Sequence, residues 1–148
     1  MGVEIKSDIF LEIFQTLINT SYNSNPEFRI SSLYTIGYIF DEINPKFLNE
    51  DTRKKFLFSI VNNFDENYIE VLKVAINSFS KILPFIKNIF QINELKTQLM
   101  EKIFNLNNTE LIYNDLLLIL SEICKFYYNE LNGYDIKKIT EISEKCVI

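Results

Sequence analysis

The chain has 148 residues, of which 47% are apolar and 14% aromatic, with only 3 glycines and 3 prolines, and this composition predicts one folded, soluble domain with a sizeable core. The net charge of −5 argues against binding to nucleic-acid phosphates, and the lack of histidine argues against a zinc site. No apolar run approaches the roughly 20 residues that a membrane-spanning helix needs, so we expect no membrane span.

Apolar residues recur at helical spacing along the chain. Ser7 is the predicted N-cap of the first helix. The second begins with Asn25 as N-cap and Pro26 at its first helical position, and it ends at Ile43 because Pro45 disfavours helical geometry in the residue before it. The predicted helices cover about 7–20, 26–43, 50–64, 67–83, 92–105 and 110–131, and a seventh begins in 134–148.

A proline and an Asn-Gly dipeptide are predicted to end helices in the second half of the chain. Pro84 removes a backbone donor and is expected to end or kink the fourth helix. The dipeptide Asn132-Gly133 is typical of a helix C-terminus and is expected to close the sixth. No segment alternates apolar and polar residues as a strand would, so the predicted fold class is all-α.

The helices repeat with a period of about 41–43 residues, which is typical of HEAT repeats. The segments around Leu33-x-x-Ile36, Ile76-x-x-Phe79 and Leu117-x-x-Leu120 align in register, each preceded by a shorter helix. The predicted architecture is a right-handed, armadillo-like α-α superhelix of about three helical hairpins. Its repeats are 7–43, 49–89 and 91–131, and 134–148 begins the next. Gly37 lies inside the second helix, where a glycine indicates the close approach of a neighbouring helix.

The segment "SLYTIGYIFDEINP" resembles the importin-beta (karyopherin) family, in which a similar stretch ends the inner helix of an N-terminal repeat. The resemblance continues through "VLKVAINSFSKILPFIKNIF" and "LLLILSEICKFYYNEL" in the same order, so it covers nearly the whole chain from Ser7 onward. It implies a fragment spanning about the fourth to sixth HEAT repeats of a nuclear import receptor.

The resemblance also implies partners and location. Such receptors carry cargo through the nuclear pore by binding Phe-Gly nucleoporins on the outer helices. The inner helices bind Ran-GTP, basic localisation signals or the importin-alpha adaptor. The expected location is the cytoplasm, the nucleus and the nuclear pore, and no cofactor is expected.

The third predicted helix is apolar on two stripes, one with Phe56 and Ile60 and the other with Leu57 and Val61, so it is buried on several sides or leaves an apolar groove. The resemblance implies that the main Phe-Gly pocket lies between this helix and the fifth. The family has an aromatic residue where Gln98 stands and an acidic one where Leu95 stands. The implied pocket residues are Leu57, Phe58, Val61, Leu95, Gln98 and Leu99.

The even-numbered helices are expected to carry an acidic surplus on the concave face of the superhelix. Such a face suits basic cargo through long-range attraction, although a solvated polar face with no partner gives the same pattern. The predicted cargo contacts are Asp41, Glu42, Glu70, Asp115 and Glu122.

Two rival functions remain open on the sequence alone. Another HEAT scaffold, such as a phosphatase scaffold or a chromosome-condensing subunit, has the same periodicity but lacks the resembling segments. A small helical enzyme is disfavoured because the chain has no histidine and no glycine-rich phosphate loop, and Cys124 lies within an apolar helical run. Cys124 and Cys146 fit no CxxC spacing and are expected to be reduced thiols.

Overall fold

The computed structural model describes residues 2–43, 48–64, 67–107 and 109–147, and their side chains from residue 9 onward. In these ranges the chain forms α-helices and short 3-10 helices and no strand, which confirms the all-α prediction. The prediction for Pro45 lies outside the described residues. The α-helices are α1 (Gly2–Thr20), α2 (Pro26–Glu42), α3 (Glu50–Val61), α4 (Ile69–Ile82), α5 (Lys87–Phe90), α6 (Asn93–Phe104), α7 (Tyr113–Tyr127) and α8 (Gly133–Cys146).

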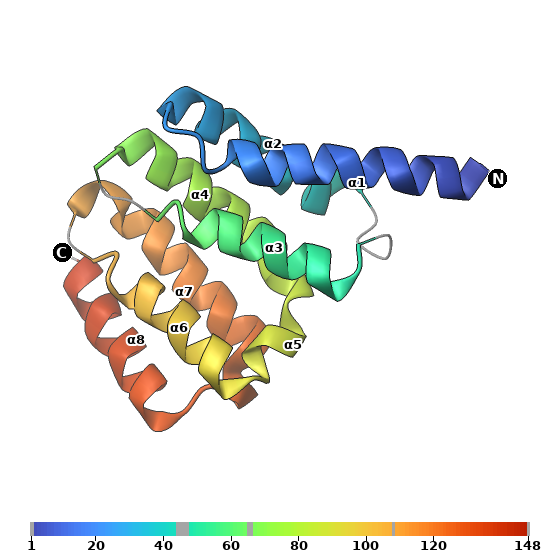
Figure 1. Cartoon of the computed structure of the whole chain (residues 1–148). Coiled ribbons are helices and arrows are strands. Elements are labelled where there is room, and N and C mark those ends of the chain that lie inside the picture. The colour runs from blue at the N-terminus through green and yellow to red at the C-terminus, as the bar shows by residue number, and fades with distance from the viewer. Residues whose placement is uncertain (1, 44–47, 65–66, 108, 148) are drawn as a thin grey trace.

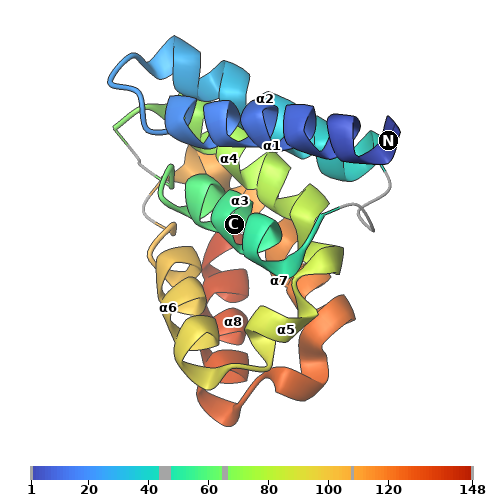
Figure 2. The same cartoon turned by 45° about the vertical axis from the view of Figure 1, so that its right-hand side comes forward.

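The helices pack in two layers. Figure 1 shows α1, α3, α6 and α8 on the near side and α2, α4 and α7 behind them. Within the rear layer α2 packs against α4 and α4 against α7, while α1 lies beside α3 and α6 beside α8 in the front layer. The short helix α5 lies where the chain passes from α4 to α6, at the lower right of Figure 1 and facing the viewer in Figure 2.

Helix starts follow the predicted caps in part. Asn25 accepts a hydrogen bond from the Glu27 amide at 3.0 Å and Pro26 opens α2, as predicted. Ser7, however, is not an N-cap, because α1 already begins at Gly2. The residues between Gly2 and Ser7 contain no proline or further glycine, so no breaker stops the helix from extending backwards.

The prediction for Asn132-Gly133 was wrong, because this pair begins a helix instead of ending one. The Asn132 side chain accepts a hydrogen bond from the Asp135 amide at 2.8 Å, and the Asp135 carboxylate accepts one from the Asn132 amide at 3.1 Å. This is a reciprocal capping box, and Gly133 is the first residue of α8. Asn132 therefore acts through its side chain, whereas the predicted C-terminal cap depends on a left-handed backbone that Gly133 does not adopt.

The aligned apolar rows form the core, as their register predicts. Leu33, Ile36, Phe79 and Leu120 are each buried, and Leu117 is half-buried. A Cβ atom at Gly37 would lie 2.8 Å from the Ser78 Oγ of α4, so the predicted close approach to this glycine is confirmed.

Hydrogen bonds from side chains to backbone carbonyls connect helices that are distant in sequence. Ser78 Oγ donates to the Leu33 carbonyl at 2.7 Å and joins α4 to α2. The buried Asn63 amide donates to the Ser21 carbonyl at 2.9 Å, which ties the end of α3 to the end of α1. Because an unmade buried hydrogen bond costs about 1–3 kcal/mol, these bonds specify how α2 packs against α4 and α1 against α3.

The chain turns sharply after α4, and α7 completes this elbow. Pro84 lies in the 3-10 helix Leu83–Phe85 and ends α4, as predicted. The Tyr127 hydroxyl of α7 donates to the Leu83 carbonyl and accepts a hydrogen bond from the Ile86 amide at 3.3 Å. The Tyr127 ring stacks on Phe90 with 4.2 Å between the ring centroids. One buried side chain thus satisfies two backbone groups at the break in the helix.

We expect Tyr127 to ionise at higher pH than a tyrosine in a solvent-exposed peptide. Burial is the main cause that raises its pKa to about 12. The hydrogen bond from the Ile86 amide lowers this pKa and the charge of Glu130 raises it. Below pH 10 the hydroxyl is protonated in both states, but between about pH 10 and 12 only the unfolded state loses the proton, so stability falls as the pH rises.

Absorbance near 295 nm during an alkaline titration of the folded chain tests this. One of the 8 tyrosines should ionise late, and Tyr127→Phe should remove that late component. If all 8 ionised together near pH 10 while circular dichroism showed a folded chain, Tyr127 would not be buried as described.

The first half of α1 extends beyond the other helices (Figure 1). Ile9, Phe10, Leu11 and Ile13 are exposed, whereas Phe14 is buried against Phe56 with 5.3 Å between the ring centroids. Among the described side chains of α1, those that pack in or against the core are Phe14, Leu17 and Ile18, all in its second half.

Candidate protein-binding surfaces

The six residues of the predicted Phe-Gly pocket divide between core and surface. Leu57, Val61 and Leu99 are only 1%, 2% and 4% exposed and belong to the main core. Phe58 and Leu95 are half-buried and Gln98 is exposed. The Lys54 ammonium lies 6.0 Å from the centre of the Phe58 ring. A peptide could therefore reach Phe58, Leu95 and Gln98, but it could reach the other three only if α3 and α6 moved apart.

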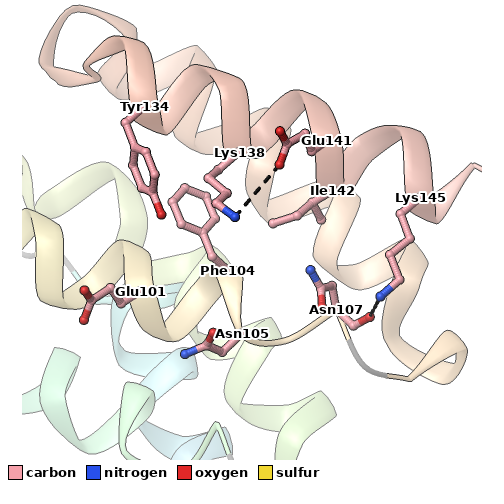
Figure 3. A pocket seen from close by; sticks show the side chains of 9 residues that line it. All are labelled: Glu101, Phe104, Asn105, Asn107, Tyr134, Lys138, Glu141, Ile142 and Lys145. Carbon is pink, nitrogen blue, oxygen red and sulfur yellow. Dashed lines mark hydrogen bonds and ion pairs between the residues drawn. The ribbon is translucent and has the colours of Figure 1, made fainter.

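An open cleft lies between α6 and α8 in the front layer (Figure 3), and not between α3 and α6, where the pocket was predicted. Its volume is about 560 Å³, which is within the usual range for ligand sites. The half-buried Phe104 of α6 gives it an apolar part, and Tyr134 stands at one end. Ile142 of α8 borders the cleft from the core and is only 4% exposed. The residues that line it are Glu101, Phe104, Asn105, Asn107, Tyr134, Lys138, Glu141, Ile142 and Lys145.

Charged side chains border this cleft and are held by local contacts. The Lys138 ammonium lies 5.9 Å from the centre of the Tyr134 ring and 3.9 Å from the Glu141 carboxylate. Lys145 donates a hydrogen bond to the Asn107 carbonyl at 2.8 Å, which connects α8 to the loop after α6 (Figure 3). The cleft thus combines an apolar part with a rim of both charge signs, an arrangement that suits a peptide side chain better than a small anion.

Sequence reasoning missed the cleft because its walls come from two helices that meet only in the folded chain. The sequence feature that could have indicated the cleft is a row of side chains at helical spacing along α8, formed by Tyr134, Lys138, Glu141 and Lys145. The row predicts one polar-aromatic face, but it does not say that α6 lies opposite.

The residues predicted to contact cargo lie on α2, α4 and α7. Asp41, Glu42 and Glu70 are exposed, while Asp115 and Glu122 are half-buried. Two of these carboxylates contact a side chain of another helix. The Asp41 carboxylate lies 3.7 Å from Lys81 Nζ of α4, and the Glu122 carboxylate of α7 accepts a hydrogen bond from the Ser80 hydroxyl at 2.8 Å. These contacts link the helices of the rear layer and leave Glu42 and Glu70 facing solvent.

A buried ion pair between α6 and α8 was not predicted. Lys96 Nζ lies 3.1 Å from the Asp135 carboxylate, and both residues are 4% exposed. Lys96 also donates a hydrogen bond to the Glu130 carbonyl at 3.0 Å. The sequence contained a sign of this ion pair. Lys96 lies on the same helix face as Leu99 and Ile103, where an apolar residue is expected, and a lysine in such a position indicates a buried partner of opposite charge.

The two thiols are free, with Cys124 half-buried and Cys146 buried. Burial raises the pKa of both; for Cys146 the charge of Lys145 opposes the effect. A raised pKa keeps a thiol protonated and poorly reactive at neutral pH.

Comparison with known proteins does not assign the chain to a family. The sequence matches no protein-family model and no curated protein. Among the described residues there is no cluster of three or more acidic or cysteine side chains placed to hold a metal ion. None of the described helices combines the length and the apolar character needed to cross a bilayer.

Proposed function

We propose that this chain is a protein-binding scaffold of the importin-beta type, part of a nuclear import receptor that acts by binding and not by catalysis. The observation that supports this most directly is the open cleft between α6 and α8, the first helices of two successive predicted repeats. A phenylalanine side chain buries about 150–250 Å². The half-buried Phe104 and the exposed ring of Tyr134 can give it apolar contact in the cleft, whereas Ile142 is 4% exposed and belongs to the core.

In this proposal the helix pairs form a right-handed HEAT solenoid. The front layer would bind Phe-Gly nucleoporins in the α6–α8 cleft, and the surface of Phe58, Leu95 and Gln98 would form a second contact. The rear layer would bind basic cargo or an adaptor, and Ran-GTP would bind through the full-length receptor. The protein would then move between cytoplasm and nucleus.

The proposal predicts that the chain binds a fluorescent Phe-Gly repeat peptide and not its Ser-Gly counterpart. Tyr134→Gln should weaken binding about 3- to 10-fold, because it removes an aromatic contact at the cleft. Tyr134 is 62% exposed, so the fold should tolerate this change. Val61, in contrast, is too buried to be varied in such a test. Fluorescence anisotropy measures the binding.

The matched control is Tyr128→Gln, which removes another exposed tyrosine outside the cleft. It should leave the binding of the Phe-Gly peptide unchanged. Equal affinity for the Phe-Gly and Ser-Gly peptides, or no binding of either, would contradict a nucleoporin-binding role and favour another helical scaffold.

A further inference from the structure

Helix α2 carries a solvent-facing stripe that its packing does not use. We call it the tyrosine–acid stripe; it consists of Glu27, Tyr34, Tyr38, Asp41 and Glu42, all of them exposed. Tyr34 and Tyr38 lie one turn apart and are 64% and 53% exposed. The opposite side of α2, including Leu33 and Ile36, is buried in the core. The tyrosines therefore have no role in closing the core.

The stripe has little positive charge of its own. Arg29 is the single basic residue of α2, and its guanidinium lies 5.3 Å from the centre of the Tyr68 ring and donates to Asn63. Lys81 of α4 pairs with Asp41 at 3.7 Å and offsets one of the three carboxylates. Glu27 and Glu42 make no ion pair with another described residue, so the stripe keeps a net negative charge.

A cation lies against three of the exposed aromatic rings elsewhere in the chain. Arg29 lies over Tyr68, Lys138 over Tyr134 and Lys125 over Phe126. Tyr34 and Tyr38 have no such cation among the described residues, and their hydroxyl groups make no hydrogen bond there. Rings that are exposed, adjacent and flanked by carboxylates are the environment that an external guanidinium group prefers, since it can stack on the ring and pair with the acid.

We propose that the tyrosine–acid stripe binds an extended, arginine-containing segment of a partner protein. Side chains one turn apart on a helix are about 5–6 Å apart at Cβ, and alternate side chains of an extended peptide are about 6.6 Å apart. Two arginines separated by one residue can therefore stack on Tyr34 and Tyr38 together, with Glu42 beside the second ring. This inference rests on the basic-partner part of the proposed function and gives it a residue preference.

Binding of two fluorescein-labelled peptides to the whole chain tests it. One peptide carries two Arg-Ser-Arg units and the other two Lys-Ser-Lys units, so their charges are equal. The arginine peptide should bind several-fold more tightly, because a lysine ammonium stacks less well on a ring. The double variant Tyr34→Gln/Tyr38→Gln should lose several-fold in affinity for the arginine peptide and reduce it to the level of the lysine peptide.

Glutamine keeps the helix propensity high, so the double variant should stay folded by circular dichroism. Tyr128→Gln is the control and should change neither affinity. If both peptides bind equally and the double variant binds them like the unmodified chain, the inference is overturned while binding of basic partners stands. If neither peptide binds, both the inference and the basic-partner role are overturned, and the Phe-Gly peptide result is unaffected.

Discussion

Replacing Lys96 with methionine should lower the free energy of unfolding by about 3–5 kcal/mol, one of the two largest effects that we expect in this chain. Lys96 is buried, and its ammonium contacts the Asp135 carboxylate at 3.1 Å and the Glu130 carbonyl at 3.0 Å. Removing it leaves a buried carboxylate without its counter-charge and a carbonyl without its donor. Because Asp135 also caps α8, the loss should loosen the contact between α6 and α8.

Urea denaturation followed by circular dichroism measures this effect. Lys55→Met is the matched control, because Lys55 pairs with Asp51 at 3.0 Å on the exposed surface of α3. Exposed pairs contribute about 0–1 kcal/mol, so this variant should remain close to the unmodified chain. Adding Asp135→Asn to Lys96→Met should recover part of the loss, since asparagine still caps the helix but carries no buried charge. Equal effects of Lys96→Met and Lys55→Met would show that the buried pair is not desolvated.

Replacing Gly37 with leucine should lower the free energy of unfolding by about 2–3 kcal/mol, despite the gain of about 1 kcal/mol in helix propensity. A Cβ at this position would lie 2.8 Å from Ser78 Oγ and 3.3 Å from the Ser78 Cα. The side chain alone could rotate away, but the backbone atom can be avoided only if α2 and α4 separate. That separation would also break the hydrogen bond from Ser78 to the Leu33 carbonyl.

A double-mutant cycle separates this steric cause from a general loss of stability. Gly37→Ala should cost less in a Ser78→Gly background than in the unmodified chain, because the serine side chain is then absent. Thr35→Leu adds bulk to the exposed side of α2 and should change the unfolding free energy by no more than about 0.5 kcal/mol. If Gly37→Leu is as stable as Thr35→Leu, the two helices are not in close contact at Gly37.

The sequence predicted the features that depend on neighbouring residues. The spacing of Leu33, Ile36 and Phe79 predicts which side of each helix is buried, and Asn25 with Pro26 predicts where α2 begins. Asn132-Gly133 was misread because the same dipeptide can end one helix or begin the next. The acid at Asp135, which forms the capping box, decides between the two.

The binding surfaces were harder to predict because they depend on which helices meet. Helix α3 is apolar on two sides, and periodicity alone cannot distinguish a side that packs from one that lines a groove. In the folded chain Leu57 and Val61 are both in the core, and the open cleft lies between α6 and α8 instead. The likeness to import receptors, drawn from segments such as "SLYTIGYIFDEINP", stays a prediction that the peptide experiments test.

The Tyr127 contact bears on how the chain can be divided into shorter pieces. The elbow after α4 lies in the second predicted repeat, but the hydroxyl that completes it comes from α7, in the third predicted repeat. A cut between α6 and α7 would leave the Leu83 carbonyl and the Ile86 amide without this partner and would expose the face of Phe90 that Tyr127 covers. The segment from α3 to α5 is therefore not a self-sufficient module, and any autonomous piece that contains it must also contain α7.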